Sequence, residues 1–299
     1  MTRFTLVYTT ARLEPHLDWL IDGLEAQAEP ADAVQLVVVD SLGRPAQEIG
    51  FRPTPCVSLL TETRPKPTPW QGSERVTTRD WWALSSARNT GIALAREDYV
   101  VFVDDRCRLG PYWMSAVRQG CRSRVAVLAG SYSKRELGER GDPKVTLDHR
   151  LRESPRGQQS CGGGWLYGCA IAIPLAWLLE VNGFEEGCDG MGGEDYTLGL
   201  MLGNRGRRID FSADFFVEQD RCAGTGHGAC RIDKGTPPND KSHAALRRFG
   251  VRDRTEFTPD LRALRARVAA GQGFPSVDRS VVYRDWYDGQ PLHEMEGPP

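Results

Sequence analysis

Long apolar runs are absent from this sequence of 299 residues, and so is any strong excess of charge of one sign. No stretch approaches the roughly 20 consecutive apolar residues that a membrane-spanning helix needs, so we expect no transmembrane segment. The first ten residues lack the basic region, apolar core and small-residue cleavage site of a secretory signal. These absences predict an untargeted, cytoplasmic protein.

Lysine is scarce: only 5 of the 38 basic residues are lysine, and the other 33 are arginine. Compositional bias of the genome would explain this ratio without any function. The functional interpretation is that several arginines bind phosphate groups through two hydrogen bonds, which lysine does less well. The formal net charge of −2 requires neither nucleic acid nor a membrane as a partner.

The eight cysteines follow no regular spacing, and we expect reduced thiols in a cytoplasmic chain of this size. One local cluster, Cys222, His227 and Cys230, has the spacing of a zinc site but lacks an evident fourth ligand. A zinc-binding interaction module at this cluster is one alternative function.

Alternating strand and helix patterns predict the fold class. Residues 4–8 and 34–39 are short runs typical of strands buried on both faces, and a helical apolar pattern separates them. The alternation predicts an α/β fold with a mostly parallel central sheet flanked by helices. Ligands bind such a sheet beyond the carboxyl ends of its strands, where Thr9, Thr10 and Asp40 are found.

The same patterns continue along the chain. Further strands are expected at 99–103, 125–129 and 170–173, and further helices at 81–96, about 111–120, 175–181, 196–205 and 259–270. Two segments rich in proline, glycine or charge interrupt the pattern. We expect residues 52–80 to form a loop over the site and residues 131–160 to form a flexible excursion.

Two adjacent carboxylates, Asp104 and Asp105, follow the predicted strand at 99–103. Adjacent carboxylates repel each other unless something positive lies beside them. Mg²⁺ and Mn²⁺ prefer oxygen ligands and often link a carboxylate to a substrate diphosphate, so the pair suits a metal site. A turn or a helix N-cap explains the pair equally well.

A second acidic pair, Glu194 and Asp195, follows the glycines Gly192 and Gly193 at the start of a predicted helix. Glycine lets the backbone approach a ligand closely, and the helix dipole favours ionised carboxylates there. One of the two can act as general base on an acceptor hydroxyl. A helix cap needs only one acid, so the pair favours a functional site.

Two further residues have open interpretations. Arg88 lies in the segment A-R-N-T-G, in the helix before the carboxylate pair, and contacts either a phosphate or base of a ligand or one of the acids Asp40 and Asp104. His227 is one of five histidines, and an isolated histidine is more often structural than a ligand.

Together and in this order, the motifs resemble the GT-A glycosyltransferases of family 2. The segment 162–210 resembles the galactosyltransferase-type module found at the C-terminal side of such enzymes. The matching segments are Asp40, residues 87–91, 102–105 and 162–164, Asn182-Gly183-Phe184, and residues 190–195. The resemblance covers roughly residues 4–245, with gaps at 52–80 and 131–160.

The resemblance implies a GT-A (Rossmann-like) domain over residues 1–245. Its nucleotide-binding half is about 1–110 and its catalytic half about 111–245, followed by a small irregular and helical extension over 246–299. The chain departs from the family pattern where Arg106 replaces a third acid, where Ser41 follows Asp40, and where Asp189-Gly190-Met191 replaces the tryptophan that often precedes the Gly-Gly-Glu-Asp segment.

Roles for single residues also follow from the resemblance. Asp195 would be the general base and Glu194 would bind sugar hydroxyls. Asp105 would ligate Mn²⁺ or Mg²⁺, with His227, or His243 in its place, as a second ligand. The other implied contacts are with the donor: Thr9, Thr10 and Glu14 in the nucleotide pocket, Asp40 at the base, Arg88 near the base or diphosphate, Asp104 on the ribose side, Trp165 facing donor or acceptor sugar, and Gly193.

The implied activity is that of a hexosyltransferase, which transfers a sugar from a nucleotide-diphosphate sugar to an acceptor hydroxyl with inversion. A UDP-sugar is the favoured donor, and a saccharide or small molecule the favoured acceptor. One alternative acceptor is a modified base in DNA, for which arginine-rich segments at 117–124 and 134–157 argue; steep salt dependence would support it. Another alternative is a nucleotide-sugar-binding protein without catalysis, favoured if Asp195 lies turned away from the pocket.

Overall fold

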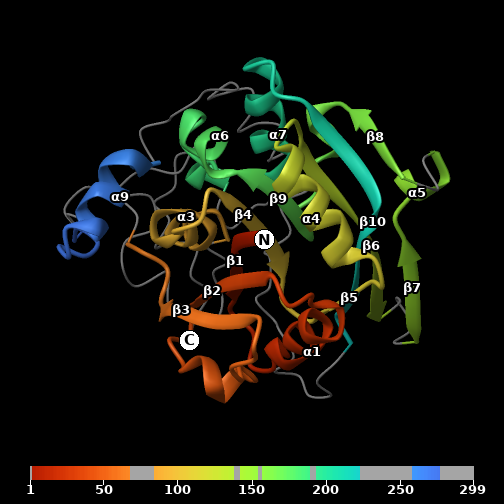
Figure 1. Cartoon of the computed structure of the whole chain (residues 1–299), viewed down its shortest axis with the longest axis horizontal. Coiled ribbons are helices and arrows are strands. Elements are labelled where there is room, and N and C mark those ends of the chain that lie inside the picture. Colours follow the sequence, from red (N-terminus) through yellow and green to blue (C-terminus); the bar gives the residue numbers. More distant parts are fainter. Residues whose placement is uncertain are drawn as a thin grey trace.

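The computed structural model describes residues 2–67, 84–137, 142–153, 157–188, 193–222 and 258–276. Within these ranges, one ten-stranded sheet runs through the molecule with helices packed on it (Figure 1). The strand order is β3-β2-β1-β4-β9-β6-β10-β5, with β7 beside β6 and β8 beside β10. The predicted α/β class, a central sheet flanked by helices, is confirmed.

Four strands form the parallel part of the sheet: β1 (Thr2–Thr10), β2 (Asp32–Asp40), β3 (Val57–Thr63) and β4 (Tyr99–Asp104). Thr10 lies opposite Asp40, and Thr9 lies opposite Asp104. The carboxyl ends of these strands therefore meet at one edge of the sheet, as the sequence predicted.

The rest of the sheet is mixed. It consists of β5 (Cys107–Leu109), β6 (Val127–Leu137), β7 (Pro143–Leu147), β8 (Gln158–Cys161), β9 (Ala170–Pro174) and β10 (Ile209–Asp220). Strand β9 runs antiparallel between β4 and β6. Every residue of β9 is buried, and a continuous apolar run has no feature that reveals strand direction. The parallel arrangement is therefore unbroken only from β3 to β4; beyond it β10 pairs with β6 in parallel and the other pairings are antiparallel.

Helices cover both faces of the sheet. On one face lie α1 (Leu17–Gln27) and α4 (Trp113–Ser123), which bury their apolar sides together with Phe4, Leu6 and Tyr8 of β1. On the other lie α3 (Leu84–Leu94), α6 (Leu175–Glu180), α7 (Glu194–Asn204) and α9 (Leu261–Ala269), which pack with residues such as Val7. Side chains alternate along β1, so this strand contributes to both cores.

Helix α3 lies unusually close to β1. A Cβ placed on Gly91 would stand 2.2 Å from Cγ1 of Val7, so only glycine permits this approach. The small residues of the A-R-N-T-G segment therefore bring α3 onto the sheet, and they fix the position of Arg88, which is almost fully buried.

Two sequence predictions for irregular segments are wrong. The flexible excursion expected at 131–160 contains the end of β6, all of β7 and β8, and the short helix α5 (Arg150–Glu153). Strand β7 is exposed along its whole length, so it has no buried face to create an apolar period. The loop expected at 52–80 begins with β3, an edge strand whose flanking prolines obscured it; residues 68–80 lie outside the described ranges.

The helix expected at 259–270 is present as α9, and it packs on α3. Leu261 and Leu264 are buried between the two helices. The guanidinium of Arg265 donates hydrogen bonds to the carbonyls of Ile92 and Ala95 at 2.5 and 2.8 Å, which caps the C-terminal end of α3. None of the described helices is both long and apolar enough to cross a bilayer.

Candidate active site

Three carboxylates stand where the parallel strands end: Asp40 after β2, and Asp104 and Asp105 at the end of β4. Each is bonded to an arginine: Asp40 to Arg44, Asp104 to Arg88 and Asp105 to Arg12. These guanidinium groups supply the positive charge that a cluster of carboxylates requires.

Asp105 is closed in by its neighbours. Thr10 Oγ1 donates to Oδ2 at 2.8 Å, and Arg12 Nε donates to Oδ1 at 2.8 Å. The side chain is only 4% exposed. Both carboxylate oxygens of Asp105 therefore already accept hydrogen bonds from the segment that follows β1.

Asp104 is more open. Arg88 donates to Oδ1 at 3.0 Å, while the nearest donor to Oδ2 is Nε2 of Gln219 at 3.5 Å. The side chain is 21% exposed. Gln219 was not predicted as a site residue, because no sequence motif shows that the end of β10 lies beside the turn after β4. Of the two adjacent aspartates, Asp104 has the oxygen better placed to meet a ligand.

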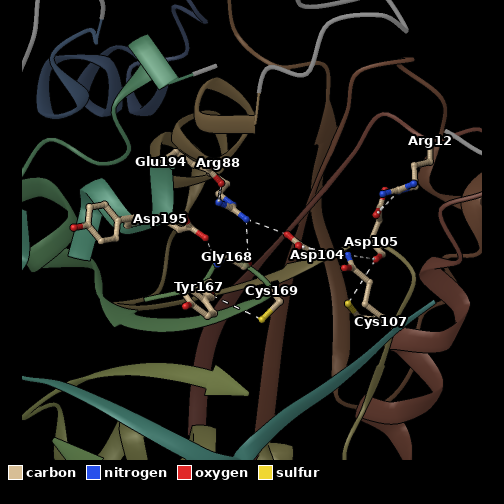
Figure 2. Close-up of polar contacts among 12 residues, drawn as sticks. Arg12, Arg88, Asp104, Asp105, Cys107, Tyr167, Gly168, Cys169, Glu194 and Asp195 are labelled. Carbon is tan, nitrogen blue, oxygen red and sulfur yellow. Dashed lines mark hydrogen bonds and ion pairs between the residues drawn. The ribbon is translucent and has the colours of Figure 1, made fainter. Parts of the chain in front are cut away.

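Arg88 connects three segments that are distant in sequence. One nitrogen donates to Glu194 at the start of α7 (2.8 Å), and the other donates to Asp104 and to the carbonyl of Gly168 (both 3.0 Å) (Figure 2). Burial alone would lower the pKa of Arg88, but Glu194 and Asp104 raise it and the net shift is upward. The arginine therefore stays charged. Of the interpretations that the sequence left open for Arg88, the pairing with Asp104 is the one found in the structure.

Asp195 lies beside this network in the first turn of α7, which begins after Gly193 in a left-handed conformation (φ 88°). Its Oδ2 accepts from the amide of Gly168 at 2.6 Å and its Oδ1 from the amide of Tyr196 at 2.8 Å. Gly168 thus contacts Arg88 through its carbonyl and Asp195 through its amide (Figure 2).

The glycines before this segment have a packing role. A Cβ on Gly163 would stand 2.3 Å from the carbonyl oxygen of Gly199 in α7. The short 3-10 helix η2 (Gly163–Trp165) therefore packs backbone to backbone against α7. Trp165 is half-buried, and its ring meets Phe211 edge-on with 5.7 Å between the centroids.

The segment between β1 and α1 is fixed by arginines. Arg44 donates to the carbonyls of Leu13 (2.7 Å) and Arg12 (2.6 Å), and Arg106 donates to that of Glu14 at 2.5 Å. The Glu14 side chain itself is exposed. The predicted pocket residues Thr9, Thr10 and Asp40 are buried, and Asp40 accepts from Arg44 Nε at 2.7 Å and from the amide of Leu42 at 3.0 Å.

Several predicted metal ligands lie outside the described ranges, namely His227, His243 and Cys230. In the part of the chain that the structure describes, no group of three or more histidine, cysteine, aspartate or glutamate side chains forms a ready metal site. Mg²⁺ and Mn²⁺ are nevertheless often held by one or two carboxylates together with substrate phosphates. A single accessible carboxylate such as Asp104 fits that kind of site.

No protein-family model matches the chain, and no curated protein matches it in sequence. Solved structures that resemble it include a crystal structure of GalNAc-T7 with UDP, GalNAc and Mn²⁺. The identity is 12%, the TM-score is 0.47, and the alignment covers 92% of this chain and 55% of that one. The chain thus spans little more than half the length of that protein, and a likeness at this level carries no argument about function.

Proposed function

We propose that the protein is a metal-dependent glycosyltransferase of the GT-A type, which transfers a sugar from a nucleotide-diphosphate donor, with a UDP-sugar favoured, to an acceptor hydroxyl. The observation that carries the proposal is the buried contact of Arg88 with Asp104 and Glu194. This contact joins three of the segments on which the resemblance rests, residues 87–91, 102–105 and 190–195, at the edge where α/β sheets bind ligands.

Asp104 is the proposed ligand of the divalent cation, since its side chain is partly exposed and its Oδ2 has only a long contact with Gln219. Bound Mn²⁺ or Mg²⁺ would neutralise charge on the leaving diphosphate. Asp105 keeps the turn after β4 in place through Thr10 and Arg12, and its side chain, only 4% exposed, is less accessible to a metal than that of Asp104. This assignment exchanges the roles that the family resemblance implies for the two aspartates. His227 stays a proposed second ligand.

Asp195 is the proposed general base. Its contact with the Gly168 amide orients the carboxylate, which takes the proton of the acceptor hydroxyl as that oxygen attacks the anomeric carbon. The bond from the anomeric carbon to the diphosphate breaks on the opposite side, so the configuration inverts. Glu194, fixed by Arg88, is the proposed contact for sugar hydroxyls.

The first experiment is a thermal-shift panel of UDP-, GDP- and TDP-sugars, each with Mn²⁺ and with EDTA. Ligands that bind the native state raise its melting temperature, so one nucleotide family should stabilise the protein only with metal. Asp104→Asn should abolish this shift. If no nucleotide sugar changes the melting temperature under any condition, the proposal fails.

Catalysis is tested separately from binding. Asp195→Asn should lower transfer, or hydrolysis of the donor by water, about 10²–10⁴-fold while donor affinity stays unchanged. Asp98→Asn, which alters an exposed acid paired with Arg124, serves as the matched control. Equal activity of Asp195→Asn and wild type would contradict the role of Asp195.

The two alternatives predict other results. A nucleotide-sugar-binding protein would bind the donor without turnover, and an enzyme for modified DNA bases would bind duplex DNA with steep salt dependence. In and around the arginine-rich segments, much of the positive charge is already paired: Arg118 with Asp32, Arg124 with Asp98, Arg135 with Asp220 and Arg150 with Asp148. These pairs weaken the argument for DNA.

A further inference from the structure

The basic side chains around the candidate site differ in whether they form an ion pair. Three arginines at the strand ends, Arg12, Arg44 and Arg88, each bond to a carboxylate. Arg221 at the end of β10 bonds to Glu136. Lys134 of β6 forms no ion pair with any residue within the described ranges, although it is half-buried. Its charge is therefore available to a ligand.

Lys134 is next to the site through the register of three strands. It lies directly opposite Gln219 of β10, which in turn lies opposite Cys107 of β5. Neighbouring strands are about 4.8 Å apart and residues directly opposite share a face of the sheet. Since the Gln219 side chain reaches Asp104 and β10 lies between β6 and β5 in the sheet, Lys134 stands one strand away from the residue that contacts the proposed metal ligand.

The ammonium group is held in place without being neutralised. Its Nζ stands 4.3 Å from the centroid of the Tyr132 ring, a cation–π contact that leaves the full positive charge. Tyr132 is itself braced by Tyr167, at 6.1 Å between ring centroids.

The field of Lys134 reaches the interior of the site. Burial, and after it the charge of Asp104, raise the pKa of the Cys169 thiol to about 12, while Lys134 acts to lower it. Asp104 and Lys134 therefore act on the same buried thiol, which agrees with the strand register.

We propose that Lys134 binds a phosphate group of the donor's diphosphate, on the β6 side of the cation held by Asp104. The inference rests on the proposed function, because it assumes a nucleotide-diphosphate ligand at this edge. An ammonium offers three donors and a compact charge, which suits phosphate oxygens. Lys134 would thereby stabilise the leaving nucleoside diphosphate with a positive charge that no carboxylate of the described residues already balances.

The test compares Lys134→Ala and Lys134→Arg with Lys144→Ala, which removes an exposed lysine of the adjacent strand β7. Calorimetry measures the affinity of each protein for UDP, UMP and inorganic pyrophosphate in the presence of Mn²⁺. Lys134→Ala should weaken UDP binding roughly ten-fold or more, since a charged hydrogen bond is lost. The loss for UMP should be smaller, Lys134→Arg should recover part of the affinity, and Lys144→Ala should bind UDP as wild type does.

The outcomes separate this inference from the proposed function. If wild type binds UDP and Lys134→Ala binds it within two-fold, the inference is overturned and the function stands. If wild type binds no nucleoside diphosphate among UDP, GDP and TDP, the donor-binding proposal fails. The pyrophosphate titration then tests Lys134 by itself. If wild type binds pyrophosphate and Lys134→Ala does not, an anion site at Lys134 is supported. If neither protein binds it, or both bind it equally, the inference about Lys134 is overturned. Far-ultraviolet circular dichroism of each variant confirms that it is folded.

Discussion

The surroundings of Asp105 and of Asp104 differ sharply although the two residues are adjacent. Asp105 is held by Thr10 and Arg12, in one short segment after β1, and both of its oxygens are engaged. Asp104 is held by Arg88 of α3, a residue that also bonds to α7 and to the segment before β9. The comparison shows that Asp105 stabilises a local turn. Asp104 is instead the partly exposed member of a group of residues that are joined by the buried Arg88.

The largest expected effect comes from removing the centre of that network. Arg88→Met removes the buried ion pair between Arg88 and Glu194, which should lower the free energy of unfolding by about 3–5 kcal/mol. Urea denaturation measures this, with Arg88→Lys as the variant that keeps the charge. A loss below about 1 kcal/mol would show that Glu194 and Asp104 find other partners when Arg88 is removed. The stability of the region around Asp104 would then depend on one residue no more than that of the region around Asp105 does.

The local region should respond less. Asp105→Asn removes the ion pair between Asp105 and Arg12 and should destabilise the fold by about 1.5–3 kcal/mol. Asp104→Asn should be milder in urea, because this side chain is more exposed, yet it should abolish metal-dependent donor binding. The comparison would be contradicted if Asp104→Asn lowered the stability in urea more than Asp105→Asn did and also kept the better donor binding of the two.

A substitution at Gly168 should disturb the contacts of Asp104 and Arg88 without changing the surroundings of Asp105. A Cβ there would stand 2.4 Å from a guanidinium nitrogen of Arg88, so Gly168→Ala should displace that arginine and lower stability by about 1–3 kcal/mol. The Asp105 region should be untouched. Amide chemical shifts of Thr10 and Arg12 that stay constant, while those of Asp104 and Glu194 move, would confirm this separation.

The smallest effect uses two glycines of the same helix, α7. Gly203 is exposed and a Cβ there meets nothing within 4 Å, so Gly203→Ala should raise stability by about 0.5–1 kcal/mol. Gly199→Ala would instead meet the carbonyl oxygen of Gly163 at 2.0 Å and should destabilise. Thermal denaturation of both variants tests whether the glycine run before β9 exists for close packing. Equal changes in the two would refute that explanation.

The sequence predicted the features that depend on local pattern. Strand ends at Thr10, Asp40 and Asp104 and the acids at the start of α7 were all anticipated, because buried runs and helix starts leave signals in sequence. Contacts between residues that are distant in sequence were not anticipated. Gln219 reaches Asp104 only because β10 pairs with β5, and no spacing along the chain encodes that pairing.

Roles that the family resemblance implied for the site residues stay predictions. The direction of β9 and the purpose of the glycines at 162–164 were equally beyond reach. An apolar strand is equally buried in either direction, and glycine at a close contact looks the same in sequence as glycine beside a ligand.

The packing of α9 on α3 bears on how the protein is made. Asn182 accepts a hydrogen bond from the amide of Leu261 and donates one to the carbonyl of Pro259, while Asn89 of α3 bonds to the backbone of Phe184. Among the described residues, the last part of the chain to pack on the helix that carries Arg88 is therefore the stretch near residue 260, which leaves the ribosome late. At common rates of synthesis this comes on the order of ten seconds after α3 itself. Until then the nascent chain keeps an uncovered apolar face, and chaperones have that interval in which to bind it.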